Sequence, residues 1–324
     1  MINDIRTQVY DSLIVDTMNM LHRLKTTDIK KPELVGEKKV YKDLVRDFIL
    51  LIEQLKGIYL KPGGEVYLLF DNPTSRISLQ KAFYNVDRKQ ISSTYKEGRK
   101  KESKEFYYSL DLIKYYFLSQ DSSYKCAQIS NLEADDLVKP LLESELGDKD
   151  NLMITNDYDW TRYLSKRTHW LKEYKGEPIT PVAFYQEHGF YPTENSIIAY
   201  KSLFGDSSDG IPNLIHKTKD HLRIFKEIYN KTPELDPKNL LFFPDVERKE
   251  NKEFFDCITK EQYKFKINIQ LTSSMKVDQS HFQKVLNSGR NAVLVTESVE
   301  KILGLRELQA SKSFQFGNVK PPRV

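Results

Sequence analysis

The chain has 324 residues, of which 39% are hydrophobic and 30% charged, and its formal net charge is +4 at pH 7. This length suffices for one large or two moderate domains with a sizeable core, and so small a net charge does not by itself indicate a nucleic-acid-binding protein. No apolar run approaches the roughly 20 residues that span a bilayer, and the N-terminus lacks the pattern of a secretion signal. Two cysteines, Cys126 and Cys257, cannot form a disulfide framework, so we expect a cytoplasmic protein that does not enter a membrane.

The first half of the chain alternates short apolar segments with segments of helical period. Helices are expected at Val40–Tyr59, at Glu105–Leu118 and after Asn131, where a helix would carry acidic residues in its first turn. This alternation predicts an α/β fold with a central, mostly parallel, doubly wound sheet. The expected strands are Leu13–Val15, Val66–Phe70, Tyr124–Ile129, Leu152–Thr155 and Thr168–Glu173.

The sequence pattern of the second half of the chain indicates helices. Helices are expected at Thr180–His188, Thr193–Phe204 and Lys217–Tyr229, followed by a proline-containing linker. Beyond Leu240 aromatic and charged residues alternate without a clear period. We therefore predict an α/β domain over residues 1–179, a helical region over 180–308 and a mobile tail over 309–324.

Carboxylates follow the ends of the expected strands. Ligands of parallel α/β sheets bind beyond the carboxyl ends of the strands, so these side chains should converge on one site. Converging carboxylates repel each other and need cations, and their hard oxygen ligands suit magnesium or manganese. The pattern predicts metal-dependent phosphodiester chemistry. The candidate metal ligands are Asp16, Asp71, Glu133, Asp135, Asp136, Asp157, Asp159 and, in a polar turn, Asp206 and Asp209.

A basic stretch accompanies this acidic set. Between Arg88 and Lys104 there are seven lysines and arginines against two glutamates, within a polar segment of weak period at about residues 74–104. Such a stretch would supply cations for a phosphate backbone if it faces the acidic site. Alternatively, the basic stretch is a solvated loop without a role in binding. For Glu133, Asp135 and Asp136 the alternative to metal binding is that acidic residues in the first turn of a helix stabilise its dipole.

Taken together, these motifs resemble the flap endonuclease-like 5′ nucleases, especially their bacteriophage 5′-to-3′ exonuclease and RNase H-type members. The resemblance covers roughly residues 12–215. It implies the PIN-like 5′-nuclease fold, a helical arch at about 74–104 above the site, and a helix–three-turn–helix element that binds DNA. The segments that carry it are Ile14–Asn19, Asp71, Arg88 with Tyr95–Arg99, Leu132–Asp136, Thr155–Trp160 and Gly205–Pro212.

The resemblance also assigns roles. Asp16, Asp71, Glu133 and Asp135 would hold a first metal ion; Asp136, Asp157, Asp159 and Asp209 would serve a second, with Asp206 outside them. Lys96 and Arg99 would stabilise charge on the scissile phosphate. The implied nucleic-acid-binding residues are Arg23, Lys25, Arg88, Tyr95, Lys217 and Lys219.

The implied cofactors are two Mg²⁺ ions, for which Mn²⁺ can substitute, and K⁺ at the helix–three-turn–helix element. The implied partners are DNA with a 5′ end, flap or nick, an RNA–DNA hybrid and a replication protein, for a chain that acts as a monomer. The sequence departs from the family in two places. The stretch between Asp71 and Arg88 is longer than in the phage relatives, and no glycine lies between Gly210 and the end of the next helix, where the family has a glycine-rich hairpin.

Two other functions fit parts of the pattern. A PIN-class ribonuclease would share the acidic site, but it would lack the Tyr95–Arg99 motif and the helical region. A catalytically silent replisome scaffold that binds DNA would explain the altered hairpin but not the full set of carboxylates. The expected function is therefore a structure-specific 5′ nuclease, acting in DNA replication or repair and removing RNA primers.

Overall fold

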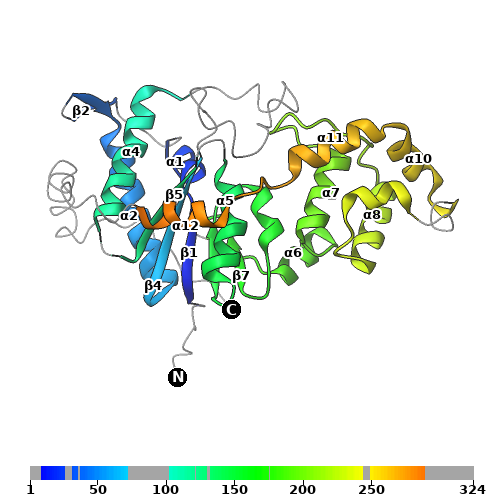
Figure 1. Ribbon diagram of the computed structural model, residues 1–324, viewed down its shortest axis with the longest axis horizontal. Helices are drawn as coiled ribbons and strands as arrows, with labels where there is room; N and C mark the ends of the chain where they lie inside the picture. Colours follow the sequence, from blue (N-terminus) through cyan, green and yellow to red (C-terminus); the bar gives the residue numbers. More distant parts are fainter. Residues whose placement is uncertain are drawn as a thin grey trace.

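The computed structural model describes residues 9–25, 31–35, 37–71, 102–120, 122–129, 132–174, 176–243 and 249–288. Its centre is a five-stranded sheet in the order β5-β4-β1-β6-β7, and all four pairings are parallel (Figure 1). The predicted α/β class with a parallel, doubly wound sheet is confirmed. The strands are β1 (Tyr10–Asp16), β4 (Leu60–Phe70), β5 (Tyr124–Gln128), β6 (Asn151–Ile154) and β7 (Thr168–Leu171).

Both faces of the sheet are buried, because helices pack against each of them. Side chains alternate between the two faces along each strand. On β1, Leu13 and Val15 face one core and Ile14 faces the other. The first core is covered by α1 (Thr17–Lys25), α2 (Lys42–Tyr59) and α4 (Lys104–Ser119). The second begins with α5 (Ala134–Leu141), whose first turn lies at the carboxyl end of the sheet.

A helical region continues the second core, beside the α/β domain (Figure 1). Asn268 joins two of its helices, donating from Nδ2 to the carbonyls of Ser202 at 3.0 Å and Pro212 at 2.9 Å. The last described helix returns to the sheet and packs beside β5. The helices are α6 (Pro181–His188), α7 (Glu194–Phe204), α8 (Lys219–Lys231), α10 (Lys252–Lys260), α11 (Gln262–Thr272) and α12 (Gln279–Ser288), with short turns η1 (Leu142–Leu146), η2 (Tyr158–Tyr163) and η3 (Pro237–Phe242).

Several elements differ from the sequence prediction. Helices α1, α10, α11 and α12 were not expected, nor was the antiparallel pair β2 (Glu33–Val35) and β3 (Lys38–Val40). Helix α5 has Glu133 at its N-cap, not the predicted Asn131. The predicted tail at 309–324 and all of the predicted arch except residues 102–104 lie outside the described residues. Among those that are described, no helix is both long and apolar enough to cross a membrane.

Candidate metal centre

The site begins where β1 and β4 end side by side. Asp16, the last residue of β1, pairs in register with Leu69 of β4, and Asp71 follows that strand. Asp16 is 5% exposed, and burial raises its pKa well above the usual range. The charges of Asp71 and Asp157 raise this pKa further, although Asp16 accepts hydrogen bonds from the Asn19 amide and the Thr155 hydroxyl. Burial and repulsion therefore outweigh these bonds.

The start of α5 adds three more carboxylates to this edge of the sheet. Asp71 Oδ1 accepts a hydrogen bond from the Ala134 amide at 2.7 Å, which ties the end of β4 to the first turn of the helix. Asp135, in that turn, is buried. Asp136 is also buried, and its two oxygens accept from the amides of Glu133 at 3.1 Å and Met275 at 2.8 Å. Asp136 thus fixes the start of α5 and the connection between α11 and α12.

The end of β6 contributes Asp157. Its Oδ1 accepts from the Asp159 amide at 2.9 Å and so caps η2, while its own amide donates to Thr155 Oγ1 at 3.0 Å. The Asn19 side chain donates to Asn156 Oδ1 and accepts from the Asn156 amide, which holds the start of α1 against the same strand end. Three neighbouring strands therefore place Asp16, Asp71 and Asp157 within electrostatic reach of one another.

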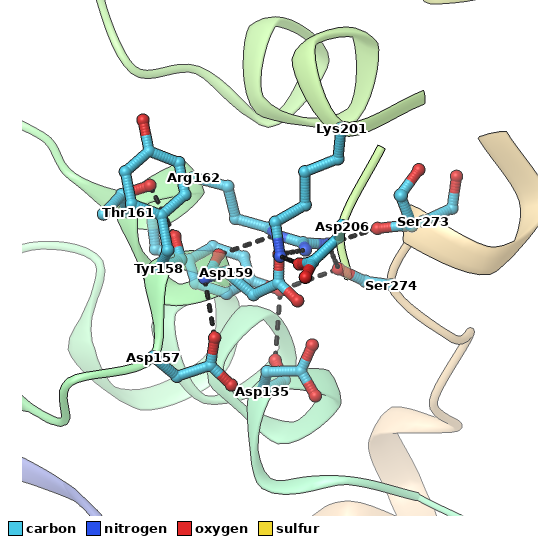
Figure 2. A network of polar contacts seen from close by, with 12 residues as sticks. Asp135, Asp157, Tyr158, Asp159, Thr161, Arg162, Lys201, Asp206, Ser273 and Ser274 are labelled. Carbon is cyan, nitrogen blue, oxygen red and sulfur yellow. Dashed lines mark hydrogen bonds and ion pairs between the residues drawn. The ribbon is translucent and has the colours of Figure 1, made fainter. Parts of the chain in front are cut away.

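A second group of carboxylates lies between η2 and the turn after α7. Oxygens of Asp159, Asp206 and Asp209 lie within 4.8 Å of one another, which is compatible with a bound cation. Lys201 projects from α7 into this group and contacts Asp159 Oδ1 and Asp206 Oδ2, the latter at 2.6 Å (Figure 2). Arg162 Nη2 reaches the same Asp159 oxygen at 2.9 Å. This second group already contains two protein cations.

The charges of the second group are mutually stabilised. Burial alone would lower the pKa of Lys201, but the charges of Asp159, Asp206 and Asp157 raise it above its usual value. Burial alone would raise the pKa of Asp206, but Lys201 and the bonds from Ser208 lower it. Lys201 is therefore protonated and Asp206 ionised at neutral pH.

The turn that carries Asp206 and Asp209 depends on Gly205. Asp206 and Ile211 exchange two backbone hydrogen bonds of 2.8 Å, which closes the turn. Gly205 has φ of 76°, and a Cβ there would lie 2.6 Å from the Asn213 amide nitrogen. Only glycine meets both requirements without strain.

We expect Gly205→Ala to lower the free energy of unfolding by about 1–3 kcal/mol more than Gly63→Ala does. Gly63 is a matched control because its φ is 79° and nothing lies within 4 Å of the position that a Cβ would take there. Both positions have a similar positive φ, and Gly205 adds a ψ of 171° and the clash with the Asn213 backbone, so the difference in urea unfolding measures these two costs together. Equal losses would show that the turn does not need this close approach.

The predicted nucleic-acid-binding residues are partly described. Arg23 donates to the Lys172 carbonyl at 2.8 Å and stacks 4.1 Å from the Tyr174 ring centroid, while Lys25 pairs with Glu102. Lys217 and Lys219 are exposed, and Lys217 Nζ lies 4.9 Å from the Tyr200 ring centroid. The predicted Lys96, Arg99, Arg88 and Tyr95 lie outside the described residues.

A cleft of about 670 Å³ opens beside both groups of carboxylates. Its lining includes the carboxylates of Asp157, Asp206 and Asp209 together with Lys201 and Lys217. A phosphate chain entering this cleft would meet both carboxylates and lysine side chains. A metal ion between the carboxylates and the phosphate would remove the repulsion between them.

Sequence reasoning missed Lys201 and Arg162. Lys201 lies four residues after the buried Ile197 on the apolar side of α7, and Arg162 lies one helical turn after Asp159. A lysine on an apolar helix face close to an acidic turn is a signal for a buried ion pair, because an isolated charge is costly to bury.

Comparison with known proteins agrees with this arrangement. Residues 11–189 match the family model of the 5′-3′ exonuclease N-terminal resolvase-like domain. The chain belongs to the 5′-3′ exonuclease family. The 5′-3′ exonuclease of Buchnera aphidicola (subspecies Schizaphis graminum) is 27% identical over 151 residues, which are 46% of this chain and 48% of that protein. The chain thus spans about half the length of this curated relative.

Solved structures show the same fold. The zinc-bound 5′-exonuclease of phage T5 has a TM-score of 0.57 at 18% identity, covering 92% of this chain and 98% of its own. The T5 flap endonuclease, in a pseudo-enzyme–product complex with DNA and metal ions, has a TM-score of 0.58 at 18% identity, with coverages of 90% and 99%. Human GEN1 bound to Holliday junction DNA has a TM-score of 0.53 at 12% identity, with coverages of 92% and 68%.

Proposed function

We propose that this chain is a divalent-metal-dependent 5′ nuclease that hydrolyses phosphodiester bonds in DNA carrying a 5′ end, flap or nick. The observation that carries the proposal is the convergence of Asp16, Asp71 and Asp157 at the ends of three adjacent strands. Burial and like charge raise the pKa of Asp16, so the metal-free arrangement is electrostatically unfavourable. A bound cation relieves this repulsion, and oxygen ligands favour a hard divalent ion.

The position of each residue indicates its proposed role in the metal site. Asp16, Asp71 and Asp157 would form the centre of the metal site, and the start of α5 would add Glu133 and Asp135. Asn19 and Thr155 hold the Asp16 carboxylate in place through the hydrogen bonds described above. A divalent ion in such a site lowers the pKa of a bound water and stabilises charge on the reacting phosphate. We propose Mg²⁺, with Mn²⁺ as a substitute.

Basic residues would bind the substrate by shape, because phosphate contacts carry no sequence information. Lys217, which lines the cleft, and Lys219 are both exposed and would contact the backbone of a duplex. Lys96 and Arg99 would stabilise the scissile phosphate, and Arg88 and Tyr95 would bind the strand that carries the 5′ end. Arg23 and Lys25 hold α1 in place through contacts with other parts of the protein, and would contact DNA only through their exposed atoms.

The finer expectations belong to the same proposal. RNA–DNA hybrids would be cleaved like DNA, because the proposed contacts are to the phosphate backbone. A monovalent K⁺ ion between α7 and α8, a replication protein as partner and action as a monomer are proposed from the family resemblance. No glycine of the family's hairpin is present between Gly210 and the end of α8, so we propose that Lys217 and Lys219 replace part of the backbone contact to duplex DNA.

The proposal is tested by cleavage of 5′-labelled flap, nicked, RNA-primed and single-stranded substrates in the presence of Mg²⁺. We expect cleavage of substrates with a 5′ end or flap, its loss in EDTA and its loss in Asp71→Asn. DNA binding without cleavage in Mg²⁺ or Mn²⁺ would refute the nuclease and favour a silent scaffold. Cleavage confined to single-stranded RNA would favour a PIN-class ribonuclease.

A further inference from the structure

We propose that the connection between α11 and α12, residues 272–275, is a brace that positions the start of α5 for metal binding and ties it to Asp159. This inference rests on the proposed nuclease function. The brace lies beyond residues 11–189, the part of the chain that the family model matches. Its residues would be positioning residues, because they act on the site through their neighbours and do not touch the reacting atoms.

Both ends of the brace are anchored in packed elements. Thr272 Oγ1, at the end of α11, lies 3.1 Å from Ser202 Oγ of α7. On the other side, Gln279 of α12 donates to the Pro140 carbonyl of α5 at 3.3 Å, and α12 packs beside β5. The chain therefore crosses from the helical region to the α/β domain past α5 (Figure 1), which restricts the position of the brace.

A series of hydrogen bonds runs from Arg162 through the brace to the start of α5. Arg162 Nη1 donates to Ser274 Oγ at 3.2 Å (Figure 2), and Ser274 Oγ lies 2.7 Å from the Tyr163 hydroxyl. The Tyr163 hydroxyl donates to the Asp135 carbonyl at 3.1 Å. A hydroxyl has a single hydrogen to donate, so Ser274 must donate to Tyr163. Every bond of the series then points toward Asp135, and the Arg162 charge strengthens the bonds by polarisation.

This series of bonds connects the two groups of carboxylates. At one end Arg162 pairs with Asp159 Oδ1 at 2.9 Å, and at the other end the Asp135 carbonyl belongs to the first turn of α5. The brace makes a further contact with that turn, because the Met275 amide donates to Asp136 Oδ1 at 2.8 Å. Arg162 is 4% exposed and Asp136 is 1% exposed, so little water competes for these bonds. The brace thus fixes the position of η2 relative to α5.

The brace would matter for the reaction through the metal ligands. Hydrogen bonds around a ligand orient it, and their loss commonly weakens metal binding. The brace would therefore hold the start of α5, with its proposed ligand Asp135, in place for a metal ion. Tyr163 and Ser274 are not among the described residues that line the cleft. Their loss should weaken metal binding and lower kcat, and should leave the KM for DNA unchanged.

The test is Mn²⁺ binding by the full chain at neutral pH, measured from the electron paramagnetic resonance signal of free Mn²⁺. We expect Tyr163→Phe and Ser274→Ala each to weaken Mn²⁺ binding about 10-fold, and Ser274→Thr, which keeps the hydroxyl, to match wild type. The double variant Tyr163→Phe/Ser274→Ala should bind like Tyr163→Phe, because the loss of one hydroxyl already interrupts the series of bonds. Cleavage of a 5′-flap substrate should show the same order in kcat.

Tyr10→Phe is the matched control. Tyr10 is a buried tyrosine whose hydroxyl lies 2.9 Å from His169 Nδ1, at the end of β1 away from Asp16. Its substitution also removes one buried hydrogen bond, so it should cost a similar amount of stability. The Mn²⁺ affinity of Tyr10→Phe should stay within about twofold of wild type, because distant sites contribute independently. Equal weakening in Tyr10→Phe and Tyr163→Phe would trace the effect to lost stability and would overturn the inference.

Two other results would also overturn the inference. One is Mn²⁺ affinity within about twofold of wild type in both Tyr163→Phe and Ser274→Ala, and the other is a wild type that binds no Mn²⁺. If one variant does not fold, the other decides. Wild type that cleaves DNA while the variants bind Mn²⁺ normally would refute the brace alone. Weakened Mn²⁺ binding in the variants, with no cleavage by wild type, would refute the nuclease and leave the brace standing.

Discussion

Asp16→Asn is expected to stabilise the metal-free protein by about 1–2 kcal/mol at pH 7 while it lowers cleavage at least about 100-fold. Burial and the charges of Asp71 and Asp157 raise the pKa of Asp16, so its ionised form opposes folding. Asparagine removes this charge but keeps the size and an oxygen acceptor. The same change removes a proposed metal ligand, so stability and activity should move in opposite directions.

The sign of the pH dependence follows from the raised pKa. The folded state binds a proton at Asp16 more tightly than the unfolded state, so metal-free wild type gains stability as pH falls through that pKa. Asp16→Asn should lose this gain. Urea unfolding in EDTA between about pH 5 and pH 8 measures it.

Asp11→Asn is the matched control, on the same strand. Asp11 accepts bonds from the Asp150 amide and Lys61, which lower its pKa, so its neutralisation should not stabilise the protein. A fall in the stability of metal-free Asp16→Asn, equal to that of Asp11→Asn, would show that Asp16 is an ordinary structural carboxylate.

Arg162→Ala is expected to lower the free energy of unfolding by about 3–5 kcal/mol, the usual cost of removing one partner from a buried ion pair. The Arg162 guanidinium connects η2 to the end of α11 through Thr272 and Ser274. Its loss would leave buried acceptors without a donor and leave Asp159 with Lys201 as its described cation. Urea unfolding measures the effect.

Arg223→Ala is the control for Arg162, because Arg223 pairs with Glu227 on the exposed surface of α8. Exposed pairs of this kind contribute little to stability, because water screens the two charges. A similar small loss at Arg162 would mean that water or a rearranged side chain replaces its hydrogen bonds, and that the connection between η2 and α11 is not a main source of stability.

The central sheet was predictable because its strands are short, apolar and separated by segments of clear period. All five predicted strands exist, and parallel pairing brings Asp16, Asp71 and Asp157 to one edge, as expected. This part of the site follows from local sequence plus one topological rule, that strand ends of a parallel sheet converge.

The helices after Leu240 were not predictable by the same means. In α11 the buried face includes Asn268 and Thr272, which interrupt the apolar period. Asn268 Nδ2 donates to α7 and to the turn after it, and Thr272 Oγ1 contacts Ser202 Oγ of α7. Lys201 is a similar case, since a buried lysine on α7 makes sense only when its distant partner Asp159 is known. The local sequence can mark such a lysine as paired, but it does not identify the distant partner.

The most direct test of the metal centre is anomalous diffraction from crystals of the protein grown with Mn²⁺. We expect an anomalous peak about 2 Å from carboxylate oxygens of Asp16 and Asp71. Absence of density there in a protein that cleaves DNA with Mn²⁺, or a peak only between Asp159 and Asp206, would contradict a metal centre at the strand ends.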